Sequence, residues 1–449
     1  MPPVSMGYFY DQGDSVCVIG AGASGLLATK NLLEHGFAVD CYERETGVGG
    51  AWNWRHDRSP VYATAHAVTS RPATQIPDFP MPDTWPDYPH HSQILSYLER
   101  YADHFDLREN IWFGTEVVQV RPAEDHRWDV ITRSTGGGTE RTHRYAAVVV
   151  ANGHNWSPKL PEYDGLDSYQ GEVIHASAFQ DAATLRGRRV LVVGAGNTGC
   201  DLAVEAAQHA KACWHSSRRG YWYAPKYLFG RPVDQVNERV LAWRLPLRVR
   251  QWLLHRALRL TVGDLTRFGL PRPDHRVYET HPIVNSQLLY YLGHGLVRPV
   301  PDVARFHPDE VELVGGETIR PDLVVFATGY LPRFDFLEPR VLGIEDGRPH
   351  LALHMFGRHP TLAVAGLLQP DAGLFPLVHW QTVTLARWLR LRSVDPGRAA
   401  AVWSWLNGLA GRRWSHTRPK ESTRHWFEVS HVRYLAALAR VLKRLEVNA

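Results

Sequence analysis

The chain has 449 residues, of which 44% are hydrophobic and 21% are charged, and its formal net charge is +4. This composition is typical of a globular protein with two or three domains, and it excludes a disordered chain. The positive excess is small and is not gathered into a basic face or tail, so we expect no nucleic-acid partner. No run approaches about 18 apolar residues and no secretory signal is visible, so we expect a cytoplasmic protein without a membrane anchor.

The four cysteines form no CxxC pair, which excludes a dithiol active site; they are Cys17, Cys41, Cys200 and Cys213. We interpret them as small buried hydrophobic residues in a reducing compartment. The sequence shows neither a metal-ligand spacing nor a Ser-His-Asp arrangement. We therefore predict no metal, and the sequence assigns no residue a catalytic role.

A dinucleotide-binding pattern opens the chain. The apolar run at 15–19 predicts a buried strand, residues 26–35 have helical spacing, and 37–42 predicts a second strand. The G-x-G-x-x-G motif between strand and helix is formed by Gly20, Gly22 and Gly25. These glycines allow a tight turn, close approach of a pyrophosphate and close helix–strand packing. Glu43 ends the second strand, where a carboxylate would bind ribose hydroxyls and repel a ribose phosphate, so this site suits FAD or NAD.

The stretch that follows is mixed in character. Residues 60–89 are rich in Pro, Asp and aromatic residues and predict an irregular crossing segment. Residues 91–105 have a helical pattern, 117–120 and 128–132 predict paired strands, and 146–151 predicts a buried strand.

The opening pattern then occurs a second time. Residues 189–193 predict a strand, 200–209 a helix and 212–215 another strand, and the glycines between them are Gly194, Gly196 and Gly199. No acid ends this unit; the chain continues instead with Ser217, Arg218 and Arg219. Hydroxyl and guanidinium groups suit a ribose phosphate, so we predict that this second loop binds NADPH.

The rest of the chain is predicted to be largely helical. Residues 236–260 combine apolar residues with arginines, which favours a helical cap with a solvated arginine face, with a helix on a membrane surface as the alternative. Further apolar runs predict strands at 323–328 and 361–367 and helices at 376–391, 399–409 and 432–445.

Several segments resemble those of the flavin-containing monooxygenases, a family of class B flavoprotein monooxygenases. Residues 169–179 are similar to the family's central fingerprint, with Tyr169 where the family usually has Phe, and 326–330 are similar to its second fingerprint. Other similar segments are 49–52, 78–82, 216–222 and 280–285. On these motifs the chain is identified as a soluble, bacterial-type member.

The resemblance implies an α/β fold with two Rossmann-like dinucleotide-binding domains. The FAD domain would comprise 1–165 and 328–449, and the NADPH domain 166–327, with a helical insertion at about 225–292. The segment around His175 would join the domains and line the NADPH cleft, with a packed hinge as the plainer interpretation. The predicted FAD-side residues are Gly20, Gly22, Ala23, Ser24, Gly25, Glu43, Trp52, Thr69, Val117, Thr328 and Gly329. The predicted NADPH-side residues are Gly194, Gly196, Asn197, Thr198, Gly199, Asp201, Ser217, Arg218 and Arg219.

The resemblance also implies the reaction. NADPH would reduce FAD, the reduced flavin would form a hydroperoxide with O2, and one oxygen atom would pass to nitrogen or sulfur of a small organic substrate. The partners are then this substrate and O2, with a homodimer as a possible assembly. We expect residues 221–229, Asn285 and the helix at 376–391 to shape the substrate pocket.

One departure from the family pattern leaves alternatives open. Many members place an Asn near the reactive edge of the flavin, where this chain has Val68. Either Thr69 or His66 substitutes for it, or the hydroperoxide is less protected and the protein is an uncoupled NADPH oxidase. A Baeyer–Villiger monooxygenase shares both glycine loops, although such enzymes usually have Trp in the segment where this chain has Phe179 followed by Gln and Asp. A non-enzymatic flavoprotein scaffold is the remaining alternative.

Overall fold

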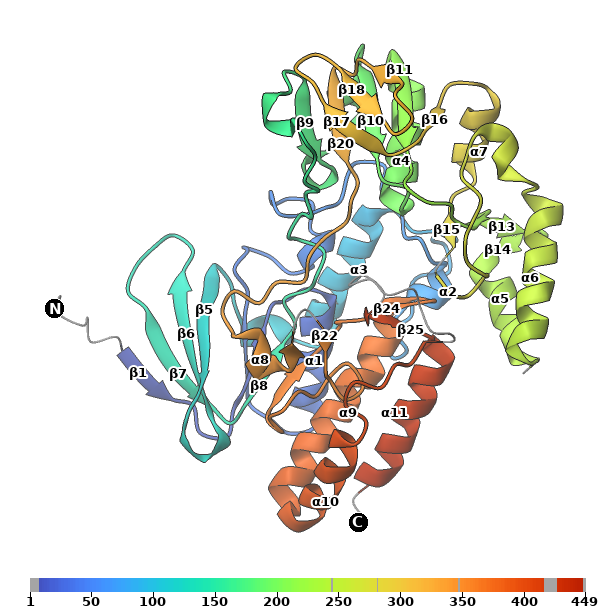
Figure 1. Cartoon of the computed structure of the whole chain (residues 1–449). Coiled ribbons are helices and arrows are strands. Elements are labelled where there is room, and N and C mark those ends of the chain that lie inside the picture. The colour runs from blue at the N-terminus through green and yellow to red at the C-terminus, as the bar shows by residue number, and fades with distance from the viewer. Residues whose placement is uncertain (1–7, 244, 281, 346–347, 416–425, 447–449) are drawn as a thin grey trace.

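The computed structural model describes residues 8–243, 245–280, 282–345, 348–415 and 426–446. Two five-stranded parallel sheets organise these residues, one in the lower half and one in the upper half of Figure 1. In the order of their pairing, the first sheet contains β23 (Leu362–Val364), β8 (Ala147–Val150), β2 (Val16–Ile19), β3 (Val39–Tyr42) and β4 (Ile111–Trp112). The second contains β16 (Arg298–Val300), β11 (Ala212–Ser216), β10 (Arg189–Val193), β20 (Leu323–Phe326) and β9 (Glu172–His175).

The two sheets have a common plan. In each, a central strand leads through a glycine loop and a helix to its neighbour, and an antiparallel sheet is inserted before the next inner strand. The first antiparallel sheet contains β5 (Thr115–Pro122), β6 (Trp128–Ser134) and β7 (Arg141–Tyr145), and β1 (Tyr8–Asp11) joins its edge parallel to β7. The second contains β17 (Val303–Phe306), β18 (Val311–Leu313) and β19 (Thr318–Ile319). This repetition confirms the predicted fold class, a doubled dinucleotide-binding architecture.

The helices cover the sheets unequally. α1 (Ala23–Glu34) packs on the first sheet and against α9 (Leu374–Val394), which also contacts α10 (Pro396–Asn407) and α11 (His431–Leu445). α3 (His91–His104) contacts α1, and α4 (Asn197–His209) packs on the second sheet. Figure 1 shows α9, α10 and α11 gathered beside α1, while α5 and α6 stand at the right edge of the view. The other helices are α2 (Arg71–Thr74), α5 (Val233–Ala242), α6 (Leu247–Thr261), α7 (Gln287–Gly293) and α8 (Pro339–Leu342).

Short two-stranded pairings complete the described structure. They are β12 (Tyr223–Ala224) with β15 (Ile283–Val284), β13 (Tyr227–Leu228) with β14 (Arg231–Pro232), β21 (Ile344–Glu345) with β22 (Arg348–Pro349), and β24 (Gln369–Pro370) with β25 (Glu428–Val429).

The sequence pattern located the strands and helices of both β-α-β units, the strands β5, β6, β8, β20 and β23, and the helices α3, α9, α10 and α11. The helical cap expected over 236–260 consists of two helices, because Pro246 caps the start of α6 and a proline cannot continue a helix from the preceding turn. β9 and β16 to β19 were not predicted as strands, since each has at most four residues and β9 lies inside the fingerprint at 169–179.

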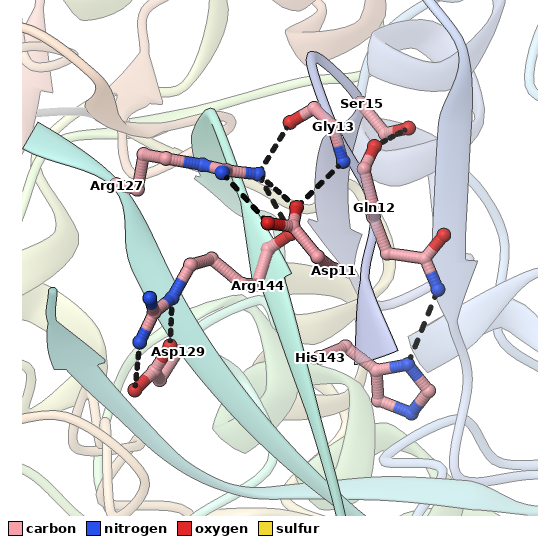
Figure 2. Close-up of polar contacts among 8 residues, drawn as sticks. All are labelled: Asp11, Gln12, Gly13, Ser15, Arg127, Asp129, His143 and Arg144. Carbon is pink, nitrogen blue, oxygen red and sulfur yellow. Dashed lines mark hydrogen bonds and ion pairs between the residues drawn. The ribbon is translucent and has the colours of Figure 1, made fainter. Parts of the chain in front are cut away.

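Strand β1, also not predicted, is fastened to the first antiparallel sheet by charge (Figure 2). The Arg127 guanidinium donates to the Asp11 carboxylate at 2.5 and 3.1 Å and to the carbonyl oxygen of Gly13 at 2.7 Å. Arg144 of β7 pairs with Asp129 of the adjacent strand at 2.8 and 3.2 Å. The Arg127 contacts support the parallel pairing of β1 with β7, and the Arg144 pair joins β7 to β6.

Candidate functional site

A single cleft of about 2360 Å³ is lined by residues of both glycine loops and of the elements between the two sheets. Both loops lie at the carboxyl ends of the central strands, β2 and β10, which is where ligands bind in open parallel sheets. The cleft therefore brings the two predicted nucleotide sites into one continuous space.

The first loop has the backbone geometry that a pyrophosphate needs. Gly20 has a φ of +100°, and a Cβ built on Gly25 would lie 1.7 Å from the carbonyl oxygen of Gly20. Gly22 caps α1 without a side chain, and the first turn of that helix has no acidic residue. The first N–H groups of α1 therefore have no side-chain acceptor at this cap, and the helix dipole favours a phosphate there.

Glu43 lies at the end of β3 and is built into the loop. Its Oε2 accepts a hydrogen bond from Ala21 N at 2.7 Å, and its Oε1 accepts one from Glu45 N at 2.9 Å. Burial raises the pKa of Glu43, and these two backbone bonds oppose that rise. Each oxygen can accept a further hydrogen bond, which fits ribose hydroxyls and not a ribose phosphate.

The second loop repeats this backbone geometry. Gly194 has a φ of +116°, and a Cβ built there would lie 2.4 Å from the carbonyl oxygen of Ala327. A Cβ on Gly199 would lie 1.9 Å from the carbonyl oxygen of Gly194, and Gly196 caps α4 without a side chain. The residues therefore fit a second dinucleotide.

The end of β11 is basic, and its three predicted residues lie in different places. Arg218 is exposed and lines the cleft. Arg219 also lines it, but its Nε donates to the Tyr221 hydroxyl at 3.0 Å and its guanidinium lies 5.0 Å from the centre of that ring. Ser217 is buried and is not among the residues that line the cleft, so of the three only the two arginines lie where a ligand in the cleft can contact them.

His175 lies at the end of β9, where the chain passes between the sheets. Its Nε2 lies 3.1 Å from the carbonyl oxygen of Gly329 and its Nδ1 lies 2.9 Å from Ser177 Oγ. Burial lowers the pKa of His175, which keeps the ring neutral at neutral pH. These contacts favour the packed-hinge interpretation over a direct chemical role.

Asp201 lines the cleft, but protein groups already bind both of its oxygens. Tyr62 donates its hydroxyl to Oδ2 at 2.7 Å, and Asn285 donates its Nδ2 to Oδ1 at 2.7 Å. Asn285 is itself buried and does not line the cleft, so the expectation that it shapes the substrate pocket is wrong. His281, from the same motif, lies outside the described residues.

The segment aligned with the reactive edge of the flavin contains Val68, which is 41% exposed and lines the cleft. The hydroxyl of Thr69 lies 2.8 Å from the Thr74 hydroxyl, and His66 Nδ1 lies 2.8 Å from the Thr64 carbonyl oxygen. Both candidate substitutes line the cleft and already have a protein partner. Val68 therefore presents an apolar side chain where the family pattern has an amide.

Helices α5 and α6 form an apolar wall of the cleft. Seven aliphatic side chains of these helices line it: Val233, Val236, Val240, Leu253, Leu254, Ala257 and Leu258. Two polar side chains of α5 line it as well, Asp234 and Asn237, and they accept hydrogen bonds from Ser70 N and the Tyr278 hydroxyl. The opposite face of α6 exposes Arg248, Trp252 and Arg256. From 376–391 no residue lines the cleft; the neighbouring Leu374 and Phe375 do, and Trp222 does not, which corrects the expected pocket. The sequence indicated a cap here but gave no sign of which of its faces turned inward.

Of the twenty predicted cofactor residues, all but Gly25, Gly199 and Ser217 line the cleft. The first two act through the close packing that their missing side chains permit. Among the described residues, no helix is both long and apolar enough to span a bilayer. Within the same ranges, no group of three or more His, Cys, Asp or Glu is arranged to hold a metal ion.

Comparison with known proteins gives the family. The flavin-binding monooxygenase-like (FMO-like) family matches residues 13–399. A dimethylaniline monooxygenase [N-oxide-forming] 2 of Rattus norvegicus is 33% identical over 392 residues, covering 83% of this chain and 72% of that protein. Flavin-containing monooxygenase 1 of Sus scrofa is 32% identical, with the same coverage.

Solved structures show the same fold at lower identity. A flavin-containing monooxygenase from Stenotrophomonas maltophilia has a TM-score of 0.65 and 21% identity, covering 85% of this chain and all of that one. Cyclohexanone monooxygenase in an open form has a TM-score of 0.69 and 21% identity, covering 97% and 98% of the two chains. The chain belongs to the flavin-containing monooxygenase family, and it is an FAD- and NADPH-dependent enzyme that inserts oxygen from O2 into its substrate.

Proposed function

We propose that this enzyme transfers one oxygen atom to nitrogen or sulfur of a small, largely apolar molecule. The observation that carries the proposal is that one cleft with an apolar wall contains two glycine loops (the two cradles), the first accompanied by Glu43 and the second by Arg218. An apolar wall favours a tertiary amine or a thioether whose single soft atom faces the flavin, because polar groups would be left unpaired against it. The name of the Rattus norvegicus relative, N-oxide-forming, is consistent with such a substrate.

We propose the following assignment of residues to the two cofactors. Residues 1–165 and 328–449 would form the FAD domain and 166–327 the NADPH domain, with 225–292 as the insertion that supplies the apolar wall. The first loop, Glu43 and Trp52 would hold FAD, with Thr69, Val117, Thr328 and Gly329 around it. The second loop, Thr198, Arg218 and Arg219 would hold NADPH, and Asp201 would act through the residues that it binds.

When bound, NADPH supplies a hydride and FAD supplies the redox centre that activates O2. The protein residues orient and shield these groups. The free N–H groups of α1 and α4 bind the pyrophosphates, and Arg218 neutralises the ribose phosphate. The aliphatic side chains of α5 and α6 exclude water from the reacting atoms, which limits hydrolytic and peroxide-forming side reactions.

The test is product analysis with isotopically labelled O2 and a panel of tertiary amines, thioethers and cyclic ketones. We expect labelled N-oxides or sulfoxides, formed in proportion to the NADPH consumed. Labelled esters from the ketones would instead establish the Baeyer–Villiger alternative.

An NADPH oxidase is a second candidate function, and the exposed Val68 favours it. Peroxide equal to the NADPH consumed, with every substrate of the panel and without any substrate, would establish it and contradict the proposed oxygenation. Peroxide that falls when a substrate is added would support the oxygenation.

We also propose a cytoplasmic location, which the four free, buried cysteines support. Detection of the protein in a membrane or secreted fraction would contradict this location. A homodimer is proposed from the resemblance alone, and sedimentation velocity would distinguish it from a monomer.

A further inference from the structure

A short segment that follows the first nucleotide unit in the chain places two of its side chains in the core around the second sheet. Tyr62 and Ala65 belong to that core, and the Tyr62 ring packs edge-on against Phe179 with 5.9 Å between centroids. The Ala63 N–H donates to the Gln180 carbonyl oxygen at 2.8 Å. The His91 N–H at the start of α3 donates to the Ala65 carbonyl oxygen at 2.9 Å, so segment 61–65 joins the second sheet to a helix of the flavin side.

Two side chains of this segment bind carboxylates of α4. Tyr62 donates to Asp201 Oδ2 at 2.7 Å, and Thr64 donates to Glu205 Oε1 at 2.6 Å. Asp201 and Glu205 are four residues apart and so lie on the same face of the helix. Hydrogen bonds to carboxylates are roughly twice as strong as those between neutral groups, so the pair holds α4 at two points one turn apart.

Further hydrogen bonds hold the other side of α4. Asn285 donates to Asp201 Oδ1 at 2.7 Å, and its own Oδ1 accepts from Gln287 N and Leu288 N at the start of α7. Asn197 at the first turn of α4 accepts from Val284 N at 3.1 Å. The N-terminus of α4 is therefore fixed with respect to segment 61–65 and to the end of the insertion.

These contacts lie between the proposed NADPH site and the proposed flavin site. The N-terminus of α4 is where the NADPH pyrophosphate binds, and segment 61–65 continues directly to Val68 and Thr69 at the edge of the flavin site. A rotation of the second sheet against the first would have to break either the Tyr62 and Thr64 bonds or the bond between segment 61–65 and α3. The Tyr62 and Thr64 hydrogen bonds therefore help to set the distance between the two glycine loops.

We propose that Tyr62 and Thr64 are positioning residues, which clamp α4 to the flavin side of the cleft and so fix the nicotinamide against the flavin for hydride transfer. This inference rests on the use of both FAD and NADPH. Neither residue needs to touch a cofactor, because a displacement of about 1 Å between reacting groups can lower a rate by as much as about a hundredfold.

The experiment uses Tyr62→Phe, Thr64→Val and the double variant of the FAD-loaded enzyme, all of which keep the shape of the side chain. We expect anaerobic flavin reduction by saturating NADPH to slow about tenfold in the double variant, a barrier change of about 1.4 kcal/mol. The Kd for NADP⁺ and the affinity for FAD should each change less than about twofold. Thr64→Ser retains the hydroxyl, so this variant should reduce its flavin at the wild-type rate, unlike Thr64→Val.

Two matched measurements identify a clamp as the cause. Tyr169→Phe is the control, because it removes a tyrosine hydroxyl bond of 2.6 Å to the Pro321 carbonyl oxygen. Both residues of that bond flank the second sheet, so the variant should leave flavin reduction unchanged. Amide hydrogen exchange at 61–65 and at the first turn of α4 should accelerate in the double variant and not in Tyr169→Phe.

A wild-type rate of flavin reduction and wild-type exchange in the double variant would overturn the proposal. An equal loss of rate in Tyr169→Phe would also overturn it, since the effect would then be general destabilisation. If the wild-type enzyme reduces its flavin but oxygenates nothing, the proposed substrate class fails, while the reduction and exchange measurements still test the clamp.

Discussion

The two glycine loops have closely similar backbones and dissimilar surroundings. In both, the first glycine has a positive φ, above +95°, and a Cβ on the third would lie within 2 Å of the first glycine's carbonyl oxygen. The acid after the first loop is buried and bonded to two backbone N–H groups, whereas the first arginine after the second loop is exposed. α1 is covered by α9, with α10 and α11 beyond it, while α4 is covered by shorter elements, including α7.

The difference separates two tasks. The glycine backbone recognises a pyrophosphate, which both cofactors share, and the residue at the end of the next strand recognises the ribose, in which they differ. The buried, rigid first site suits a cofactor that remains bound through many turnovers. The exposed second site suits one that must enter and leave in each cycle.

The largest expected effect comes from filling the two cradles separately. Gly25→Val and Gly199→Val each place atoms on the carbonyl oxygen of the loop's first glycine, at 1.7 and 1.9 Å from the Cβ alone. We expect Gly25→Val protein to lose FAD and much of its folded population, at a cost of more than about 4 kcal/mol. Gly199→Val should remain yellow and lose reduction by NADPH. Absorbance of the purified proteins and anaerobic reduction measure both outcomes, and equal loss of FAD in the two variants would contradict separate sites.

Removal of each arginine tests ribose recognition at the second loop. Arg218→Ala should raise the KM for NADPH by about 10- to 100-fold, which corresponds to about 1.5–3 kcal/mol for a hydrogen-bonded charge pair, and leave the KM for NADH unchanged. Arg219→Ala should have a smaller effect, because that guanidinium is shared with Tyr221. Steady-state kinetics with both nucleotides, and Glu43→Gln as the matched change at the first loop, measure the difference. An equal effect on NADPH and NADH would assign Arg218 another role.

Restoring the family's amide tests the reactive edge. Val68→Asn should lower the peroxide released per NADPH by about 2- to 12-fold, because a single hydrogen bond contributes about 0.5–1.5 kcal/mol. Val68→Leu serves as the control that changes volume without adding a donor. Equal peroxide from all three enzymes would indicate that Thr69, His66 or another group already protects the flavin.

The last expected effect, on stability and not on turnover, concerns a contact between α5 and the last helix. His431 Nδ1 lies 2.6 Å from Asp371 Oδ1, and its Nε2 lies 2.7 Å from Glu238 Oε1 of α5. Burial lowers the pKa of His431, but the bonds to Asp371 and Glu238 outweigh burial and raise it to about 9. Because the folded pKa exceeds the unfolded value of about 6.5, the stabilisation is complete below about pH 6.5 and is lost as pH rises through about 9.

Denaturant unfolding measures this contribution. The difference in free energy of unfolding between wild type and His431→Gln should shrink by about 1–2 kcal/mol from about pH 6 to about pH 10. His307, whose Nε2 lies 3.1 Å from the half-exposed Glu312, provides a surface pair for comparison. A difference that is independent of pH would contradict the assigned charge state of His431.

The sequence predicted the parts of the site that have a periodic or spaced signature. Both β-α-β units, their glycines, Glu43 and Arg218 were found in this way, because strand, loop and helix follow one another within about 30 residues. The contacts of Tyr62 with Asp201 and of Asn285 with Asp201 join residues 139 and 84 positions apart, and no local pattern reports them. The inward faces of α5 and α6 were likewise invisible, since both faces of these helices contain large apolar residues.

The central claim is that the two cradles place a nicotinamide against a flavin. The most direct test is to add NADPH, and separately NADH, to the purified FAD-containing enzyme without oxygen and follow the visible absorbance of the flavin. We predict complete bleaching by one equivalent of NADPH and much slower bleaching by NADH at the same concentration. The account would be contradicted if the protein takes up no FAD, or if its bound flavin stays oxidised when NADPH is added.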